Sequence, residues 1–307
     1  MQEVKEYVPN ELSFERAVKE ETQVTANYER GLVKDVLRSI LENKLAIVCA
    51  VVLLLITIMS IAAPLSPYDP DKQDLLNKLA PISKKHLFGT DDLGSDYFTR
   101  ALYGGRISLA VGFLSMLLST TIGTIIGTVS GYMGGKVDTI LMRFTDIFMS
   151  VPSFLLMVVI NSLFPPKVYS MILILGLFEW CQIARITRAE TLSLKERDFV
   201  LASKHLGASH AHIIFKHIIP NMSASIIVAG SLAVARAILT ESALSFMGLG
   251  VQLPKASWGT MLQSAQIYIM DRPTLAIFPG LLIVFTVFSF NVLGDALRNA
   301  LEPKIMK

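Results

Sequence analysis

Residues 45–63 form a run of nineteen consecutive residues without a charged side chain. As an α-helix rising about 1.5 Å per residue, this run spans roughly 28 Å, close to the thickness of the hydrocarbon core of a bilayer. Other long uncharged runs recur along the 307 residues, of which 52% are hydrophobic and only 17% are charged. A water-soluble domain of this size needs more charge on its surface, so the sequence predicts an all-α membrane protein.

These runs divide the chain into membrane segments and connecting loops. The segments expected to cross the membrane are 45–63, 107–131, 137–160, 168–183, 222–246 and 274–293. The remaining parts are a cytosolic tail at 1–44, extracytoplasmic loops at 64–106 and 247–273, a cytoplasmic loop at 185–221 and a cytosolic C-terminus at 294–307. Lys and Arg are in excess beside the ends assigned to the cytosol, which places both termini of this six-helix chain inside.

Composition also narrows the range of functions. The net charge is only +3, which gives no reason to expect a nucleic-acid partner. The first thirty residues carry seven glutamates and lack an apolar core, so they are not a secretory signal. We expect them to be loosely ordered or helical on the membrane surface. Cys49 and Cys181 lie far apart in apolar segments and are interpreted as small hydrophobic residues.

No catalytic constellation emerges from the sequence. The triplet Gly134-Gly135-Lys136 resembles the end of a phosphate-binding loop, but the earlier glycine and the hydroxyl residue after the lysine are missing, which predicts a turn. His210 and His212 are two positions apart, and helical neighbours at that spacing point in different directions. We therefore expect no catalytic residue and no metal ligand.

Charged residues near one end of a membrane segment suggest local pairing. Arg143 and Asp146, three positions apart, can meet on one helix face, and we expect a structural ion pair between them. Glu179 lies near the predicted end of its segment and is expected at the cytoplasmic interface of the membrane.

Two further charges, Arg236 and Glu241, lie deeper in the segment 222–246. Ionised side chains in lipid are costly and usually face protein or water. Because these two are five positions apart, they point to different faces of a helix. Two interpretations stay open: they line a polar pathway, or they pair with a neighbouring helix or a partner subunit.

A stripe of small residues follows one face of the second membrane segment. Its members recur every four positions, at Ser115, Ser119, Gly123, Gly127 and Gly131. Without side-chain bulk, another helix can approach closely there. We expect Gly123, Gly127 and Gly131 to serve helix packing rather than a substrate path.

The cytoplasmic loop has the pattern of two short helices joined by a turn. Ser193, with Glu196 three positions later, fits a capping box at the start of the first helix. Gly207 suits the end of that helix, where a left-handed residue is wanted, and Ser209 can cap the second helix. Pro220 sets the end of the second helix or a kink before the next membrane segment. The loop is expected to protrude as a rigid helix pair whose turn of small residues lets a partner come close.

The same loop resembles the signature of binding-protein-dependent importer permeases of the ATP-binding-cassette class. That signature joins Glu-Ala-Ala to a glycine and then to Ile-x-Leu-Pro at fixed spacing. The matching residues are Ala202, Gly207 and Pro220, with Ser203 in place of the second alanine and Ile219 in place of the leucine. Leu201 stands in place of the glutamate and His217 in place of the isoleucine. The resemblance implies contact with a separate ATPase through Leu201, Ala202, Ser203, Gly207, Ala208 and Pro220.

Longer stretches resemble the dipeptide/oligopeptide permease family, and within it the C-type of the two paired subunits. These stretches are 88–96, 105–109, 142–152, 244–259 and 291–298. The resemblance covers most of residues 30 to 305. It implies a type I importer permease fold in the cell membrane of a prokaryote.

The partners and the cargo are implied in the same way. A second, homologous permease subunit would complete the pathway, two ATPase subunits would lie below it, and an extracytoplasmic substrate-binding protein would lie above it. ATP and Mg would be bound by the ATPases, so no cofactor is expected on this chain. The implied cargo is di- or oligopeptides, and the alternative is nickel or another small solute.

Other classes of membrane protein fit less well. A stand-alone secondary transporter predicts inverted internal repeats, which the sequence does not show. A membrane-embedded enzyme would need paired catalytic groups within the spans, and no candidate has a partner at a workable spacing.

Overall fold

The computed structural model describes residues 40–165, 167–252 and 254–301, and most of these residues are helical. The helices are α2 (Lys44–Ile61), α3 (Tyr97–Met133), α4 (Gly135–Ser150), α5 (Ser153–Leu163), α6 (Val168–Leu194), α7 (Asp198–His205), α8 (His210–Ile213), α9 (Ile219–Asn221), α10 (Ser223–Phe246), α11 (Trp258–Ala265) and α12 (Thr274–Leu301). Short helical turns are η1 (Ala63–Leu65), η2 (Leu75–Asn77), η3 (Ile214–Ile218) and η4 (Gln266–Tyr268). Within the described residues, β-structure amounts to one bridge between Thr90 and Asp96.

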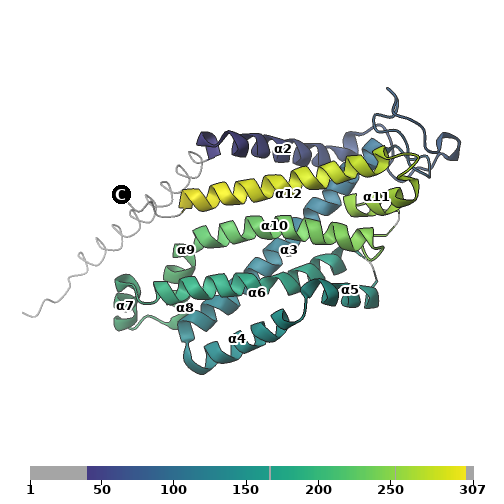
Figure 1. Ribbon diagram of the computed structural model, residues 1–307. Coiled ribbons are helices and arrows are strands. Elements are labelled where there is room, and N and C mark those ends of the chain that lie inside the picture. The colour runs from purple at the N-terminus through teal and green to yellow at the C-terminus, as the bar shows by residue number, and fades with distance from the viewer. Residues whose placement is uncertain (1–39, 166, 253, 302–307) are drawn as a thin grey trace, which may run out of the picture.

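The long helices form a bundle that can cross a membrane. Figure 1 shows α2, α12, α10 and α6 running in the same general direction, with α3 crossing them at a slant, and α3 packs against α2, α6 and α10. By length and hydropathy α2, α3, α6, α10 and α12 can each span a bilayer, and α4 with α5 passes the same test as a bent pair. The predicted all-α membrane architecture is therefore confirmed, with five such helices, or six if the bent pair forms one span.

Several helices extend beyond the predicted membrane segments. The segment expected at 107–131 is part of α3, which begins at Tyr97 because the Asp96 side chain caps it by accepting a hydrogen bond from Thr99 N at 2.8 Å. The segments expected at 168–183 and 274–293 continue as α6 to Leu194 and as α12 to Leu301. Hydropathy marks the part of a helix that lies in lipid, whereas backbone hydrogen bonding continues where polar side chains reach water.

The third segment differs from the prediction in being broken. The sequence suggested one continuous helix over 137–160, but α4 and α5 are bent by 79° at Val151 and Pro152. Proline has no backbone N–H and keeps the preceding residue out of the helical region. Val151 accordingly is extended, with φ −101° and ψ 135°. Gly134, with φ +65°, forms the tight turn between α3 and α4.

The small-residue stripe of α3 packs against α6. A Cβ atom built on Gly123 would lie 2.7 Å from Ile183 Cβ, and one on Gly131 would lie 2.8 Å from Thr191 Cβ. Between them, a Cβ on Gly127 would collide with Thr187 Oγ1 and with the Ala184 carbonyl oxygen. All three glycines are buried against this neighbouring helix, so the stripe brings two backbones together and does not line an open path.

The packing at Gly127 leads to a stability prediction. Gly127→Ala should lower the thermal unfolding midpoint in detergent, because the added methyl group meets a backbone carbonyl and forces α3 and α6 apart, at a cost of about 1–3 kcal/mol. Gly230→Ala is the matched control, since its Cβ would meet Met116 Sδ at an ordinary 3.4 Å. Equal midpoints for the two variants would contradict this account of the α3–α6 contact.

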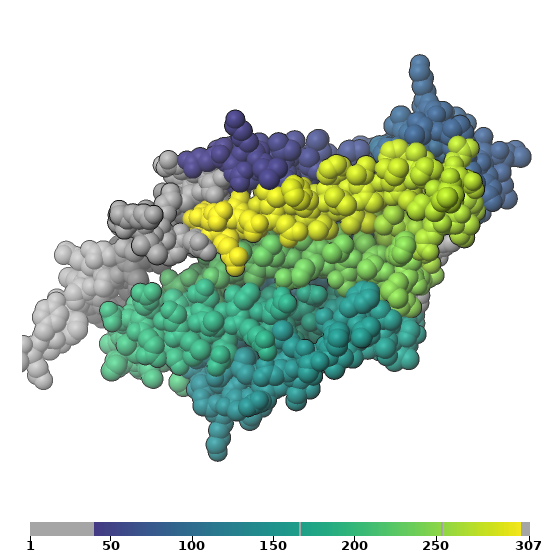
Figure 2. Space-filling model, in the orientation of Figure 1, coloured from purple at the N-terminus to yellow at the C-terminus, as the bar shows by residue number. Residues whose placement is uncertain are grey.

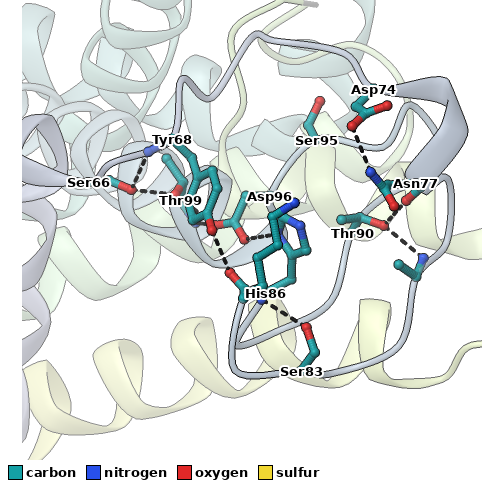
Figure 3. A network of polar contacts seen from close by, with 12 residues as sticks. Ser66, Tyr68, Asp74, Asn77, Ser83, His86, Thr90, Ser95, Asp96 and Thr99 are labelled. Carbon is teal, nitrogen blue, oxygen red and sulfur yellow. Dashed lines mark hydrogen bonds and ion pairs between the residues drawn. The ribbon is translucent and has the colours of Figure 1, made fainter.

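The end of the bundle that the sequence predicts to be extracytoplasmic carries a compact segment, residues 66–96, which we call the outer cap. Polar contacts hold much of it together, as Figure 3 shows: His86 Nδ1 lies 2.8 Å from Asp96 Oδ1, and Ser66 Oγ lies 2.6 Å from Thr99 Oγ1. A buried ion pair, Asp91 Oδ2 to Arg100 Nη1 at 3.0 Å, fastens the cap to the start of α3. The cap therefore sits on α3 as an ordered unit.

Candidate functional site

The most prominent feature of the loop predicted to be cytoplasmic is the segment 198–213, which we call the cytoplasmic tip. It holds α7, the turn at Gly207 and α8, and it lies at the end of the molecule opposite the outer cap (Figures 1 and 2). Its inner side is a small hydrophobic core of Val200, Ile213, Ile214, Ile218 and Met222, against which Tyr132 and Leu194 pack. This core attaches the tip to the ends of α3 and α6.

Local chemistry shapes the turn of the tip. Gly207 has φ +81°, a conformation that other residues rarely adopt, and its N–H donates to the Lys204 carbonyl at 3.1 Å. Ala208 N–H donates to the Ser203 carbonyl at 3.1 Å, and Ser209 Oγ accepts from His212 N at 3.2 Å to cap α8. The chain thus ends α7, reverses and starts α8 within four residues, 206–209.

The start of the first loop helix differs from the expectation. Ser193 lies inside α6, which runs on to Leu194, and α7 begins at Asp198 after Arg197, whose side chain makes no capping bond. An N-cap residue needs non-helical backbone angles. Ser193 cannot have them, because Lys195 N still donates to the Thr191 carbonyl at 2.9 Å. The capping box predicted at Ser193 and Glu196 is therefore wrong.

The outer side of the tip is exposed and has room for a partner. Ala202, Gly207 and Pro220 are exposed, while Leu201, Ser203 and Ala208 are half-buried. A Cβ on Gly207 would meet no atom within 4 Å. Leu206 is 87% exposed, an unusual cost for a leucine in water. In the described part of the chain no three His, Cys, Asp or Glu side chains gather closely enough to hold a metal ion. The surface is suited to contact rather than to chemistry.

An ion pair joins three helices of the bundle close to the tip. Arg188 of α6 donates from Nε and Nη2 to the two carboxylate oxygens of Asp138 of α4, at 2.6 and 2.7 Å, and Ser130 of α3 donates to the same carboxylate. Planar, bidentate pairs of this kind are the geometrically strictest ion pairs in proteins. Three helices are thus joined close to the tip. No pattern in the sequence singled out Asp138 and Arg188, since they are fifty positions apart.

The ion pair expected between Arg143 and Asp146 does not form. Asp146 Oδ1 instead lies 2.6 Å from Arg185 Nη2 on α6, and Arg143 is exposed. Spacing along one helix shows which residues can meet, but a guanidinium on the neighbouring helix competes for the same carboxylate.

The deeper charges lie in two different surroundings. Arg236 of α10 pairs with Glu179 of α6 at 3.4 Å, and both side chains remain partly exposed. Glu241 is fully buried and does not line an open pathway. Its carboxylate accepts hydrogen bonds from Ser245 at 2.7 Å and from Ser108 of α3 at 3.1 Å. Glu179 stands near the middle of α6, which continues well past residue 183 to Leu194.

The comparisons with known proteins agree with this architecture. Residues 123–307 match the family model "Binding-protein-dependent transport system inner membrane component", and residues 31–81 match the "N-terminal TM domain of oligopeptide transport permease C". The chain is 44% identical to the oligopeptide transport system permease protein OppC of Bacillus subtilis over 90% of this chain and 91% of the relative. It is 41% identical to the dipeptide transport system permease protein DppC of the same organism, over 89% of this chain and 86% of the relative.

A solved structure shares the fold. A chain of the MetNI methionine ABC transporter in an inward-facing conformation aligns with a TM-score of 0.54 and 20% identity, over 64% of this chain and 94% of that chain. The chain described here therefore belongs to the family of binding-protein-dependent transport system inner membrane components, and within it to the C-type permeases.

Proposed function

We propose that this chain is one of two homologous permease subunits of an ATP-driven importer of peptides, with ATP and Mg bound by two separate ATPase subunits. One observation carries the proposal. Curated relatives that are 40–44% identical over about nine-tenths of the chain are named as oligopeptide and dipeptide permeases. A nickel or small-solute importer is the weaker reading, because these relatives carry peptide names.

The geometry of the tip supports the coupling part of the proposal. An exposed helical turn, built of small residues and fixed to α6 through a hydrophobic core, can transmit movement of a docked ATPase to the bundle. Close packing of α3 on α6 at the glycine stripe makes those two helices move as one body. ATP would then act by favouring one of two arrangements of the bundle.

Reconstitution tests the proposal. Proteoliposomes are prepared that hold both permeases and both ATPases, and they are supplied with the extracytoplasmic binding protein. We expect them to take up labelled tri- to pentapeptides only when ATP is present on the side of the membrane that the ATPases face. The same vesicles should not accumulate Ni²⁺, and the purified chain alone should hydrolyse no ATP. ATP hydrolysis by the chain alone, or nickel uptake without peptide uptake, would contradict the proposal.

A further inference from the structure

The ion pair of Glu179 and Arg236 lies halfway along two membrane helices. Glu179 stands eleven residues after the start of α6, and Arg236 stands thirteen residues after the start of α10. At 1.5 Å per residue these positions are about 17 and 20 Å from the helix starts, in the middle of a bilayer. Ionised side chains are most costly there and usually face a protein-lined or water-filled space.

This pair is loose, unlike the structural pair nearer the cytoplasm. Arg188 saturates the Asp138 carboxylate with two hydrogen bonds of 2.6 and 2.7 Å. Arg236 meets Glu179 through one contact, from the buried Nε to Glu179 Oε2 at 3.4 Å, which is too loose to count as a hydrogen bond, so the donors on the two terminal nitrogens are the ones left for another partner. The Arg236 side chain is 40% exposed and that of Glu179 is 16% exposed. A guanidinium has five N–H donors, so this one keeps donors open to a further ligand.

Polar groups continue from this pair toward the cytoplasm. Gln182 and Glu190 follow Glu179 by three and eleven positions, so the three residues share one face of α6. Gln182 is exposed, and Glu190 accepts a hydrogen bond from Ser225 of α10 at 2.9 Å. This face of α6 therefore carries polar side chains at three levels, with the exposed Ile186 between Gln182 and Glu190.

On the basis of the proposed function, we propose that Arg236 and Glu179 bind the charged termini of a peptide in transit, with Arg236 receiving the α-carboxylate and Glu179 the α-ammonium group. The planar fork of an arginine fits a carboxylate with two parallel hydrogen bonds. A zwitterionic peptide that enters between the two side chains replaces their mutual contact with two contacts of its own. Because the termini are common to all linear peptides, the site accepts peptides irrespective of their side chains.

Uptake by the complete transporter in proteoliposomes tests the site. Three peptides are compared: trialanine, its C-terminal amide and its N-acetyl form, each loaded onto the binding protein beforehand. The uptake rate of each variant is divided by the wild-type uptake rate for the same peptide. Arg236→Gln should lower this ratio about tenfold for free trialanine and leave it near one for the amide. Glu179→Gln should lower the ratio for free trialanine but not for the acetylated peptide.

Other results of the uptake experiment distinguish failure of this inference from failure of the proposed function. Equal losses for all three peptides would show that the pair is structural and would overturn the inference while leaving the proposed function intact. Absence of peptide uptake by the wild-type complex would refute both. The matched control pair is Asp146→Asn and Arg185→Gln, which breaks an exposed ion pair elsewhere on α4 and α6 and should not discriminate among the peptides.

A labelling experiment tests access by water. In a chain whose two buried cysteines are replaced by alanine, Arg236→Cys should react with a charged, membrane-impermeant thiol reagent added on the side to which the transporter is open. Trialanine should slow this reaction more than its N-acetyl form does, because Glu179, which receives the α-ammonium group, is still present in this variant. Failure to label in the presence and absence of ATP would place the residue against lipid or protein and overturn the inference.

Discussion

Ala202→Arg is expected to abolish co-purification of the permease with its ATPase subunits and to reduce ATP-driven peptide uptake at least about a hundredfold. Ala202 is exposed on α7, so the isolated chain tolerates the longer side chain. In the complex the arginine would be pushed into a contact surface shaped for a methyl group, where an unpaired charge costs several kcal/mol. Pull-down of the ATPases on the tagged permease, followed by uptake in proteoliposomes, measures both effects.

The control for this prediction uses the same kind of change at the other end of the molecule. Leu76, in η2 of the outer cap, is 98% exposed, and Leu76→Arg should leave ATPase co-purification unchanged. Both variants should keep the wild-type unfolding midpoint in detergent, since neither position is packed. If Ala202→Arg retained its ATPases and its uptake, the cytoplasmic tip would not be the docking surface.

Arg100→Leu is expected to destabilise the outer cap by about 3–5 kcal/mol, because it leaves the buried carboxylate of Asp91 without its ion-pair partner. The side chains of Asp91 and Arg100 are only 7% and 9% exposed, so water cannot replace the lost contact. The thermal unfolding midpoint in detergent measures the effect. The double variant with Asp91→Asn should recover much of the loss, since an asparagine oxygen can still accept the backbone hydrogen bonds of Leu93 and Ser95.

The same pair predicts a pH dependence. Burial raises the pKa of Asp91 above its ordinary value, and the charge of Arg100 opposes that rise. A carboxyl group whose folded pKa lies above its unfolded pKa stabilises the fold most at acidic pH, and this contribution falls as pH rises through the folded pKa. Loss of Arg100 removes the charge that opposes the rise in the pKa of Asp91, so the pH range over which this contribution is present extends to higher pH. The deficit of Arg100→Leu should therefore be smaller at pH 5 than at pH 8, and an equal deficit at both values would contradict the assignment.

Local sequence determined the all-α membrane class, the runs long enough to span a membrane and the glycine turn of the cytoplasmic loop. Each of these properties depends on neighbouring residues: an uncharged run long enough for lipid, and a glycine that can take φ +81° at position 207. The break at Pro152 had a local signal too, since proline excludes the helical conformation from Val151, but the hydrophobic run across it masked that signal.

The tertiary structure alone decided which charges meet. Asp146 pairs with Arg185 rather than Arg143, Arg236 with Glu179, and Glu241 is enclosed by serines instead of facing a pathway. Helical spacing shows only that two side chains share a face; the rotation of each helix and the identity of its neighbour determine what that face meets. The glycine stripe of α3 depends on both sequence and tertiary structure. Its spacing predicts close packing with another helix, but only the fold selects α6 as that helix.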